Sequence, residues 1–323
     1  MKPLLRHAGI WIAVLLVLAV GLYPAASRSP ITRETIFTVL LSVGLASSLN
    51  ILLGYTGYVS FGHIVFFGLG GYVGFYALDV LGWHLAAATL VGGLAAGLLA
   101  LLLGLSILRL RGAYFALATI GINEAMKAFV SNFEPFGGPV GMELHFAIYQ
   151  DYGGAGQALW MVYWGTVLIA LAAVGVSFLV KRSRFGLSLM AIREDEDAAE
   201  VMGVVAPQAK TWAYVLSAIF PGMLGALFFF KQGIVEPGSA FRLHLSIELL
   251  VMVMLGGQGT VLGPILGAAA YQRLRGLLLT SAFFKNIQLA VAGLLLLLIV
   301  LFIPAGAVGW LRGCAAVLRR ILE

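Results

Sequence analysis

Uninterrupted apolar runs constrain this chain more than any other feature of its sequence. One run extends from Leu85 to Leu108 without a charged side chain, and Thr35 to Leu53 is also uncharged. A helix needs about 20 such residues to cross a bilayer core. Only 11% of all residues are charged and 61% are hydrophobic, whereas soluble domains carry about 25% charged residues. The chain is therefore predicted to be an integral membrane protein rather than a soluble or disordered one.

Apolar segments recur along the whole chain and predict an all-α, polytopic membrane helix bundle with eight to ten membrane segments. Residues 1–323 are expected to form a single transmembrane domain. Residues 1–33 are expected to be an anchor helix and a short loop, although a cleaved signal peptide has the same shape. The predicted segments are Ile10–Tyr23, Thr35–Leu53, Phe61–Leu81, Leu85–Leu108, Ala113–Val130, Gln157–Val180, Trp212–Phe230, Leu245–Tyr271 and Ile287–Ile303.

Two of these segments are rich in glycine and are expected to be broken helices. Their glycines, with those just before the first segment, are Gly54, Gly57, Gly62, Gly68, Gly71, Gly256, Gly257, Gly259 and Gly263. Broken helices in matching halves of a membrane protein point to a binding site near the bilayer midplane. The likeness of the stretches that begin at Gly57 and Gly259 favours an inverted internal repeat. Two glycine-rich helices can also look alike through composition alone.

Charged loops predict which parts lie on which side of the membrane. Residues 131–156 contain Glu134, Glu143 and Asp151 but no Lys or Arg, which is typical of an extracytoplasmic loop. Residues 181–207 contain four basic residues, Lys181, Arg182, Arg184 and Arg193, and are predicted to be cytoplasmic. If residues 187–202 form one helix, an apolar stripe on it could dock a cytoplasmic partner, or the helix could simply be a solvated connection. The number of crossings and the side of the C-terminus stay open.

The sequence contains no catalytic constellation and no nucleotide-binding loop. One cysteine and five histidines without ligand spacing build no metal site. We therefore expect no enzyme activity, no catalytic or metal-binding residues and no cofactor, and transport would draw energy from an ion gradient or from a partner protein. The net charge of +6 reflects basic residues at the ends of apolar runs, so no nucleic-acid partner is needed to explain it.

Polar side chains inside the apolar segments are the candidates for a translocation path. Ionisable groups are costly in lipid and usually face a bundle interior or water. Each of them could instead make a structural hydrogen bond, and Glu124 could pair with Lys127 at i+3. The candidate path residues are Asn50, Ser60, His63, Tyr72, Glu124 and Glu248.

Several blocks, in one shared order, resemble the branched-chain amino acid ABC transporter permeases of the LivM type. One block runs from Gly54 to Tyr72, another from Arg109 to Thr119, and a third from Ser246 to Thr260, while 301–306 resembles the closing motif of the family. A further block resembles the segment that couples such permeases to their ATPases. Its residues are Arg184, Phe185, Gly186, Ala191, Ile192, Arg193, Glu194, Glu196, Ala199 and Gly203.

The resemblance implies a pore-forming subunit in a bacterial cytoplasmic membrane that works by alternating access. It implies a second, LivH-like permease, two cytoplasmic ATP-binding subunits that use the ATP, and an extracytoplasmic substrate-binding protein. The substrate would be a branched-chain or similar small amino acid. Departures such as Tyr58 and Phe61, where the family pattern has Gln and Leu, bear on the exact substrate. Permeases for urea, amides or other amino acids, a self-sufficient ion-coupled transporter, and a membrane enzyme or scaffold remain alternatives.

Overall fold

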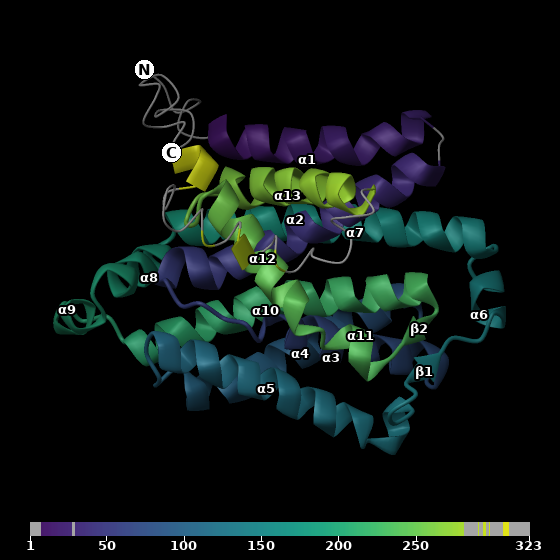
Figure 1. The fold of residues 1–323 in the computed structure, drawn as a ribbon, viewed down its shortest axis with the longest axis horizontal. Helices are drawn as coiled ribbons and strands as arrows, with labels where there is room; N and C mark the ends of the chain where they lie inside the picture. The colour runs from purple at the N-terminus through teal and green to yellow at the C-terminus, as the bar shows by residue number, and fades with distance from the viewer. Residues whose placement is uncertain are drawn as a thin grey trace.

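The computed structural model describes residues 8–27 and 30–280, together with positions 290, 293, 294, 297 and 306–309. Figure 1 shows long helices lying side by side, so that their ends gather at two opposite ends of the bundle. The long helices are α1 Ala8–Ser27, α2 Pro30–Thr56, α3 His63–Asp79, α4 Leu85–Ile107, α5 Ala113–Ser131, α7 Ala155–Arg182, α10 Ala206–Gln232, α12 Leu243–Gly256 and α13 Leu262–Thr280. The shorter elements are η2 Glu134–Phe136, β1 Met142–Glu143, α6 Ala147–Gln150, α8 Arg184–Glu194, α9 Glu196–Val201, β2 Ile234–Val235 and α11 Pro237–Ala240.

Length and hydropathy identify five membrane-span candidates among the described residues. They are Pro30–Thr56, Leu85–Ile107, Ala155–Arg182, Ala206–Gln232 and Pro237–Gly256. The chain is therefore an all-α, multi-pass membrane bundle, as the uncharged runs predict. The expected eight to ten membrane segments and the inverted internal repeat stay predictions. Most of the predicted segment 287–303, the residues around it, and parts of 1–33 lie outside the described residues.

The two polar segments lie at opposite ends of the bundle (Figure 1), which is the arrangement their opposite predicted sides require. At one end, residues 131–156 form η2, β1 and α6, and β1 pairs with β2 in an antiparallel register of Met142 with Val235. The ring of His145 lies 3.0 Å from a carboxylate oxygen of Asp79, which ties this loop to the end of α3. At the other end, α8 and α9 project from the helices.

Glycines let three central helices approach almost to backbone contact. A Cβ on Gly70 of α3 would lie 2.3 Å from the Cα of Gly222 of α10, and one on Gly222 would lie 2.5 Å from the Cβ of Ala96 of α4. Small residues at helix interfaces permit this close packing in membranes. Helix α3 runs without interruption through Gly68 and Gly71. The expectation that glycines break segment 61–81 is therefore not confirmed, because these glycines serve packing.

Residues 181–207 also differ from the single helix considered for residues 187–202. Asp195 has extended backbone angles, φ −158° and ψ 115°, and separates α8 from α9. Its side chain accepts hydrogen bonds from the backbone N–H groups of Asp197 and Ala198, so it acts as the N-cap of α9. Gly203, at φ +90°, follows the end of α9. The helix break arises because a short acidic side chain competes with the helical backbone for these donors.

Substituting Gly222 tests the close packing of α3, α4 and α10. Gly222→Ala should lower the free energy of unfolding by about 1–3 kcal/mol, because the added methyl group overpacks the interface. Gly175→Ala on α7 is the matched control, since a Cβ there meets nothing within 4 Å and Ala is the better helix former. Thermal unfolding of the purified protein in detergent measures both. Equal behaviour of the two variants would contradict the packing account.

Candidate coupling site and translocation cavity

The α8–α9 segment is seated firmly on the membrane helices. The hydroxyl of Ser183 accepts a hydrogen bond from the backbone N–H of Gly186 at 3.0 Å and caps α8. Gly186 itself has no room for a side chain, because a Cβ there would lie 1.9 Å from the carbonyl oxygen of Val180. Ile192 on α8 and Ala199 on α9 are buried against α10 residues. The sharp turn from α7 into α8 therefore fixes the direction in which the segment leaves the bundle.

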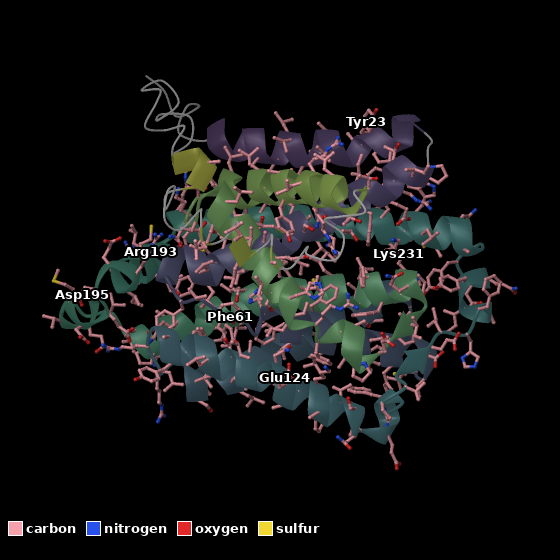
Figure 2. All side chains as sticks on the ribbon, in the orientation of Figure 1. Tyr23, Phe61, Glu124, Arg193, Asp195 and Lys231 are labelled. Carbon is pink, nitrogen blue, oxygen red and sulfur yellow. The ribbon has the colours of Figure 1, made fainter. Side chains whose placement is uncertain are left out.

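Arg193 connects this segment to two non-helical junctions of the bundle. Its Nη1 donates a 2.7 Å hydrogen bond to the carbonyl oxygen of Gly54 near the end of α2. The same nitrogen lies 2.8 Å from the position of a Cβ on Gly259, which has a φ of +74° in the turn between α12 and α13. The Arg193 side chain also passes Gly57, whose φ is +75°. Figure 2 shows Arg193 toward the end of the bundle where Asp195 also lies.

Asn50 of α2 holds the turn between α12 and α13 through backbone hydrogen bonds. Its Oδ1 accepts from the N–H of Gly259 at 2.9 Å, and its Nδ2 donates to the carbonyl of Thr260 at 3.1 Å. The Thr260 hydroxyl donates to the Gly257 carbonyl and accepts from the Gly263 N–H. A Cβ on Gly256 would lie 1.7 Å from the Gly263 carbonyl oxygen. Glycine at these positions thus permits a tight turn that α2 and α8 both contact.

Lys210 of α10 forms the centre of a second, charged network. Its ammonium donates hydrogen bonds to Glu196 Oε1 at 2.7 Å, to the Tyr58 hydroxyl at 2.9 Å and to the Leu108 carbonyl at 2.8 Å. The Tyr58 hydroxyl donates to Glu196 Oε2 at 2.7 Å. Arg111 lies 3.5 Å from Glu196 and pairs with Asp197 at 2.9 Å. Only 2% of the Lys210 side chain is exposed, so the ammonium depends on these partners.

The network keeps Glu196 ionised. Burial alone raises the pKa of this carboxyl, but the hydrogen bonds from Lys210 and Tyr58 and the charge of Arg111 outweigh burial and hold the pKa below its usual value. Burial and the Glu196 carboxylate raise the pKa of the Tyr58 phenol. Glu196 is therefore engaged within this chain, whereas its neighbour Glu194 is exposed. Of the two acidic coupling candidates, only Glu194 is free to face solvent.

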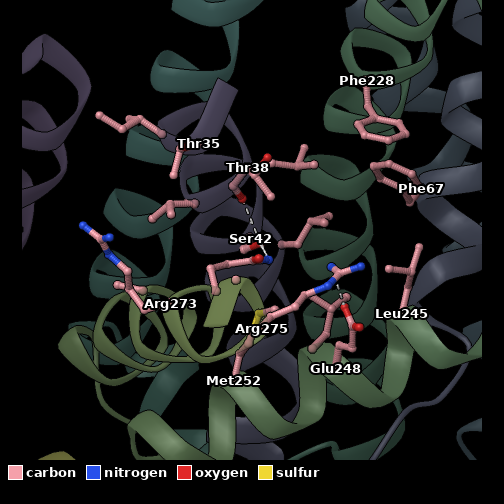
Figure 3. Close-up of a pocket in the computed structure, with 18 of the residues that line it drawn as sticks. Thr35, Thr38, Ser42, Phe67, Phe228, Leu245, Glu248, Met252, Arg273 and Arg275 are labelled. Atoms are coloured by element: carbon pink, nitrogen blue, oxygen red, sulfur yellow. Dashed lines mark hydrogen bonds and ion pairs between the residues drawn. The ribbon is translucent and has the colours of Figure 1, made fainter. Parts of the chain in front are cut away.

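A cavity of about 1350 Å³ opens between α1, α2, α3, α10, α12 and α13. Figure 3 shows two polar contacts on its wall. Arg275 Nη1 donates to Glu248 Oε2 at 3.2 Å, and Gln272 Nε2 donates to the Ser42 hydroxyl at 2.6 Å. Both bonds join α13 to another helix. Glu248 is thus a wall residue of the cavity with a cation beside it.

The other candidate path residues do not converge on this cavity. Asn50 lies at the α12–α13 turn, and Glu124 is exposed on α5, where the structure records no ion pair with Lys127. Ser60, His63 and Tyr72 are buried elsewhere, and their side-chain polar atoms make no hydrogen bond of standard geometry within the described residues. The His63 ring packs edge-on against Phe66, and the Tyr72 ring stacks on Phe241. The structure thus groups Glu248 with residues that the sequence did not select.

Sequence reasoning missed Lys210, Tyr58, Arg111 and Arg275. Lys210 stands just before the apolar run that starts at Trp212, which gives it the usual pattern of an interfacial lysine. Arg275 is 27 positions from Glu248. Two residues so far apart in the sequence show no local pattern that predicts their contact. Of these four residues, only Tyr58 could have been found from the sequence, because it departs from the family pattern between α2 and α3.

The family profile described as "Branched-chain amino acid transport system / permease component" matches residues 31–301. The chain is 28% identical over 321 residues to LivM of Escherichia coli, a high-affinity branched-chain amino acid transport system permease protein, covering 92% of this chain and 74% of LivM. It is also 23% identical to LivH of Escherichia coli over 82% of this chain and 90% of LivH. No solved structure matches significantly. The chain belongs to the branched-chain amino acid transport permease family, and its resemblance to the LivM type is confirmed.

Replacing Lys210 tests the charged network. Lys210→Met should lower the free energy of unfolding by about 3 kcal/mol, because it leaves the Glu196 carboxylate without its closest cation. Thermal unfolding in detergent measures the loss, and Lys127→Met, outside any recorded ion pair, should stay within about 0.5 kcal/mol of the wild type.

A double variant separates charge from packing in the same measurement. Lys210→Met combined with Glu196→Gln should be more stable than Lys210→Met alone, since no unpaired charge then remains. Because the folded pKa of Glu196 is depressed, its contribution is full above the ordinary carboxyl pKa and is lost as the pH falls through the folded value. Glu196→Gln should lack this acid-side loss. A double variant no better than Lys210→Met would contradict the electrostatic account.

Proposed function

We propose that this chain is the pore-forming permease subunit of an ATP-driven importer that moves branched-chain or similar small amino acids across a bacterial cytoplasmic membrane. The match of residues 31–301 to the permease family carries the proposal. The partners would be a LivH-like permease, two cytoplasmic ATP-binding subunits and an extracytoplasmic substrate-binding protein. ATP is used by the partners, so this chain needs no cofactor of its own.

The exposed surface of α8 and α9 supports a docking role. Val201 is 87% exposed, Met202 84% and Leu187 62%, which is unusual for large apolar side chains at the polar end of a bundle. Exposed apolar residues rimmed by charges mark protein interaction sites. Glu194 and Arg184 supply charge on the same short segment. We call Leu187, Val201 and Met202 the docking patch, and its partner would be an ATP-binding subunit.

Two connections would carry motion from the docking patch into the membrane. Arg193 contacts the end of α2 and the α12–α13 turn, and Glu196 is bonded to Lys210 of α10. Closure of the ATP-binding subunits would displace α8 and α9, and these bonds would pull on α2, α10 and the turn together. Alternating access then follows as a movement of these helices against the rest of the bundle.

The face of α5 around Glu124 is where we place the second permease. Glu124 and Leu117, which lies two turns earlier on the same helix face, are both exposed. A carboxylate that faces lipid is costly, so such a residue normally meets protein or water. A partner helix packed on α5 would remove Glu124 from lipid and could form a shared path there.

The alternatives have weaker support. Permeases for urea, amides or other amino acids would have the same coupling segment, so only the substrate separates them from this proposal. An ion-coupled transporter would need several carboxylates deep in the spans. Glu248, in the span candidate Pro237–Gly256, is already paired with Arg275, and Glu124 is exposed on α5.

Reconstitution tests the proposed function directly. In vesicles with the second permease and the ATP-binding subunits, leucine uptake should require both ATP and the substrate-binding protein. This chain alone, under an imposed proton or sodium gradient, should take up no leucine. Uptake driven by a gradient in the absence of the ATP-binding subunits would contradict the proposal.

The same assembly tests the docking patch. Val201→Glu should reduce recovery of the ATP-binding subunits with the permease by about tenfold, since a desolvated charge in an interface costs more than 1.4 kcal/mol. Val140→Glu is the matched control, because Val140 is 78% exposed but lies in the loop at the opposite end. Co-purification measures both. Equal recovery of the ATP-binding subunits with the two variants would contradict the docking role of the patch.

A further inference from the structure

The Glu248–Arg275 pair is the buried charged group of the cavity. The Glu248 side chain is 4% exposed and that of Arg275 is 26% exposed. Arg242 and Arg273 also line the cavity but are both exposed. Charges interact more strongly where water is excluded. A charged ligand that enters the cavity would therefore gain most at the buried pair.

Arg275 retains unused hydrogen-bonding capacity. Its Nη1 donates to Glu248, but its Nε is buried and has no partner within the described residues. A buried donor without an acceptor is costly and calls for an explanation. Guanidinium groups bind carboxylates through two parallel N–H donors. Nε itself is closed to a ligand here, but Arg275 lines the cavity with a side chain that is 26% exposed, so a ligand carboxylate could bind its remaining Nη donors beside, rather than instead of, the bond to Glu248.

Glu248 offers the complementary half of such a site. It bonds to Arg275 through Oε2. A carboxylate has about four lone-pair positions, so this oxygen pair can also accept from a ligand ammonium. A ligand with both an ammonium and a carboxylate group could place the ammonium against Glu248 and the carboxylate against Arg275. Every buried charge would then face an opposite charge. That requirement matters because an unpaired buried charge costs about 3–5 kcal/mol.

Apolar residues surround the pair on the cavity side. Figure 3 shows Leu245 and Met252 of α12 on either side of the pair, with Phe67 and Phe228 farther along the wall of the cavity. A ligand with an aliphatic side chain would bury that side chain here, at about 25 cal/mol per Å². A cavity of about 1350 Å³ is large enough for a small amino acid together with water.

We propose that the Glu248–Arg275 pair is a transit site for a zwitterionic aliphatic α-amino acid, with the ammonium on Glu248 and the carboxylate on Arg275. This inference rests on the proposed function and adds the side chains that would hold the substrate inside the membrane. The site excludes amides and urea as good ligands, because these lack both charges. It therefore separates the substrate classes that the coupling segment leaves open.

Ligand analogues test the site on the unaltered protein. The importer, assembled with its ATP-binding subunits but without the substrate-binding protein, is placed in lipid nanodiscs, and equilibrium binding of labelled leucine is measured. Leucine should bind, whereas N-acetyl-leucine and leucine methyl ester, each lacking one charge, should compete at least about tenfold more weakly. Equal competition by all three would overturn the inference. So would the absence of leucine binding, as when phospholipid fills the cavity.

A matched pair of substitutions locates the site. Arg275→Met should weaken leucine binding by about tenfold or more. Arg273→Met, on the same helix and the same cavity wall but exposed, should leave it unchanged. Wild-type affinity for leucine in Arg275→Met would overturn the inference. If that variant fails to assemble, the competition by leucine analogues on the unaltered protein decides whether the inference holds. ATP-dependent uptake by the wild type without any leucine binding would defeat this inference alone, whereas uptake without the ATP-binding subunits would defeat the proposed function.

Discussion

Backbone groups at helix ends inside an apolar bundle must find partners, and this requirement organises the structure around Arg193 and Asn50. The end of α2 exposes the Gly54 carbonyl, and the α12–α13 turn exposes the Gly259 N–H and the Thr260 carbonyl. Buried backbone groups of this kind are costly when they lack a hydrogen-bond partner. One arginine and one asparagine satisfy all three, and in doing so they join helices that are about 200 positions apart in the sequence.

This solution has a mechanical consequence. Because Arg193 belongs to α8, the partner that satisfies the end of α2 is carried by the segment that leaves the membrane. A displacement of α8 that broke the bond would leave a buried carbonyl unpaired, which costs about 1–3 kcal/mol. The helix end is therefore drawn along with α8 rather than left behind. The Lys210 network adds a second attachment, to α10, through Glu196.

The sequence predicts the class and the long helices because hydropathy and helix length are local properties, and blocks such as 54–72 carry the family pattern. It does not predict that α3 stays continuous through Gly68 and Gly71, since the residues that pack against these glycines, Phe241 and Phe229, lie far along the chain. Nor does it pair Glu248 with Arg275 or Lys210 with Glu196, because those contacts depend on how helices pack. Single polar residues such as His63, at a helix start, and Tyr72, among apolar neighbours, are path candidates by local pattern, and the structure places them away from the cavity.

The number of leucine molecules transported per ATP hydrolysed, measured in the reconstituted importer with Arg193→Met, tests the central claim most directly. Arg109→Met, an exposed arginine between α4 and α5 and outside α8 and α9, is the control. The account predicts that Arg193→Met still hydrolyses ATP but that its ratio falls by about tenfold, because a charge-assisted hydrogen bond of about 1.5–3 kcal/mol is lost from the connection. A wild-type ratio in Arg193→Met would contradict the claim that this bond transmits the motion.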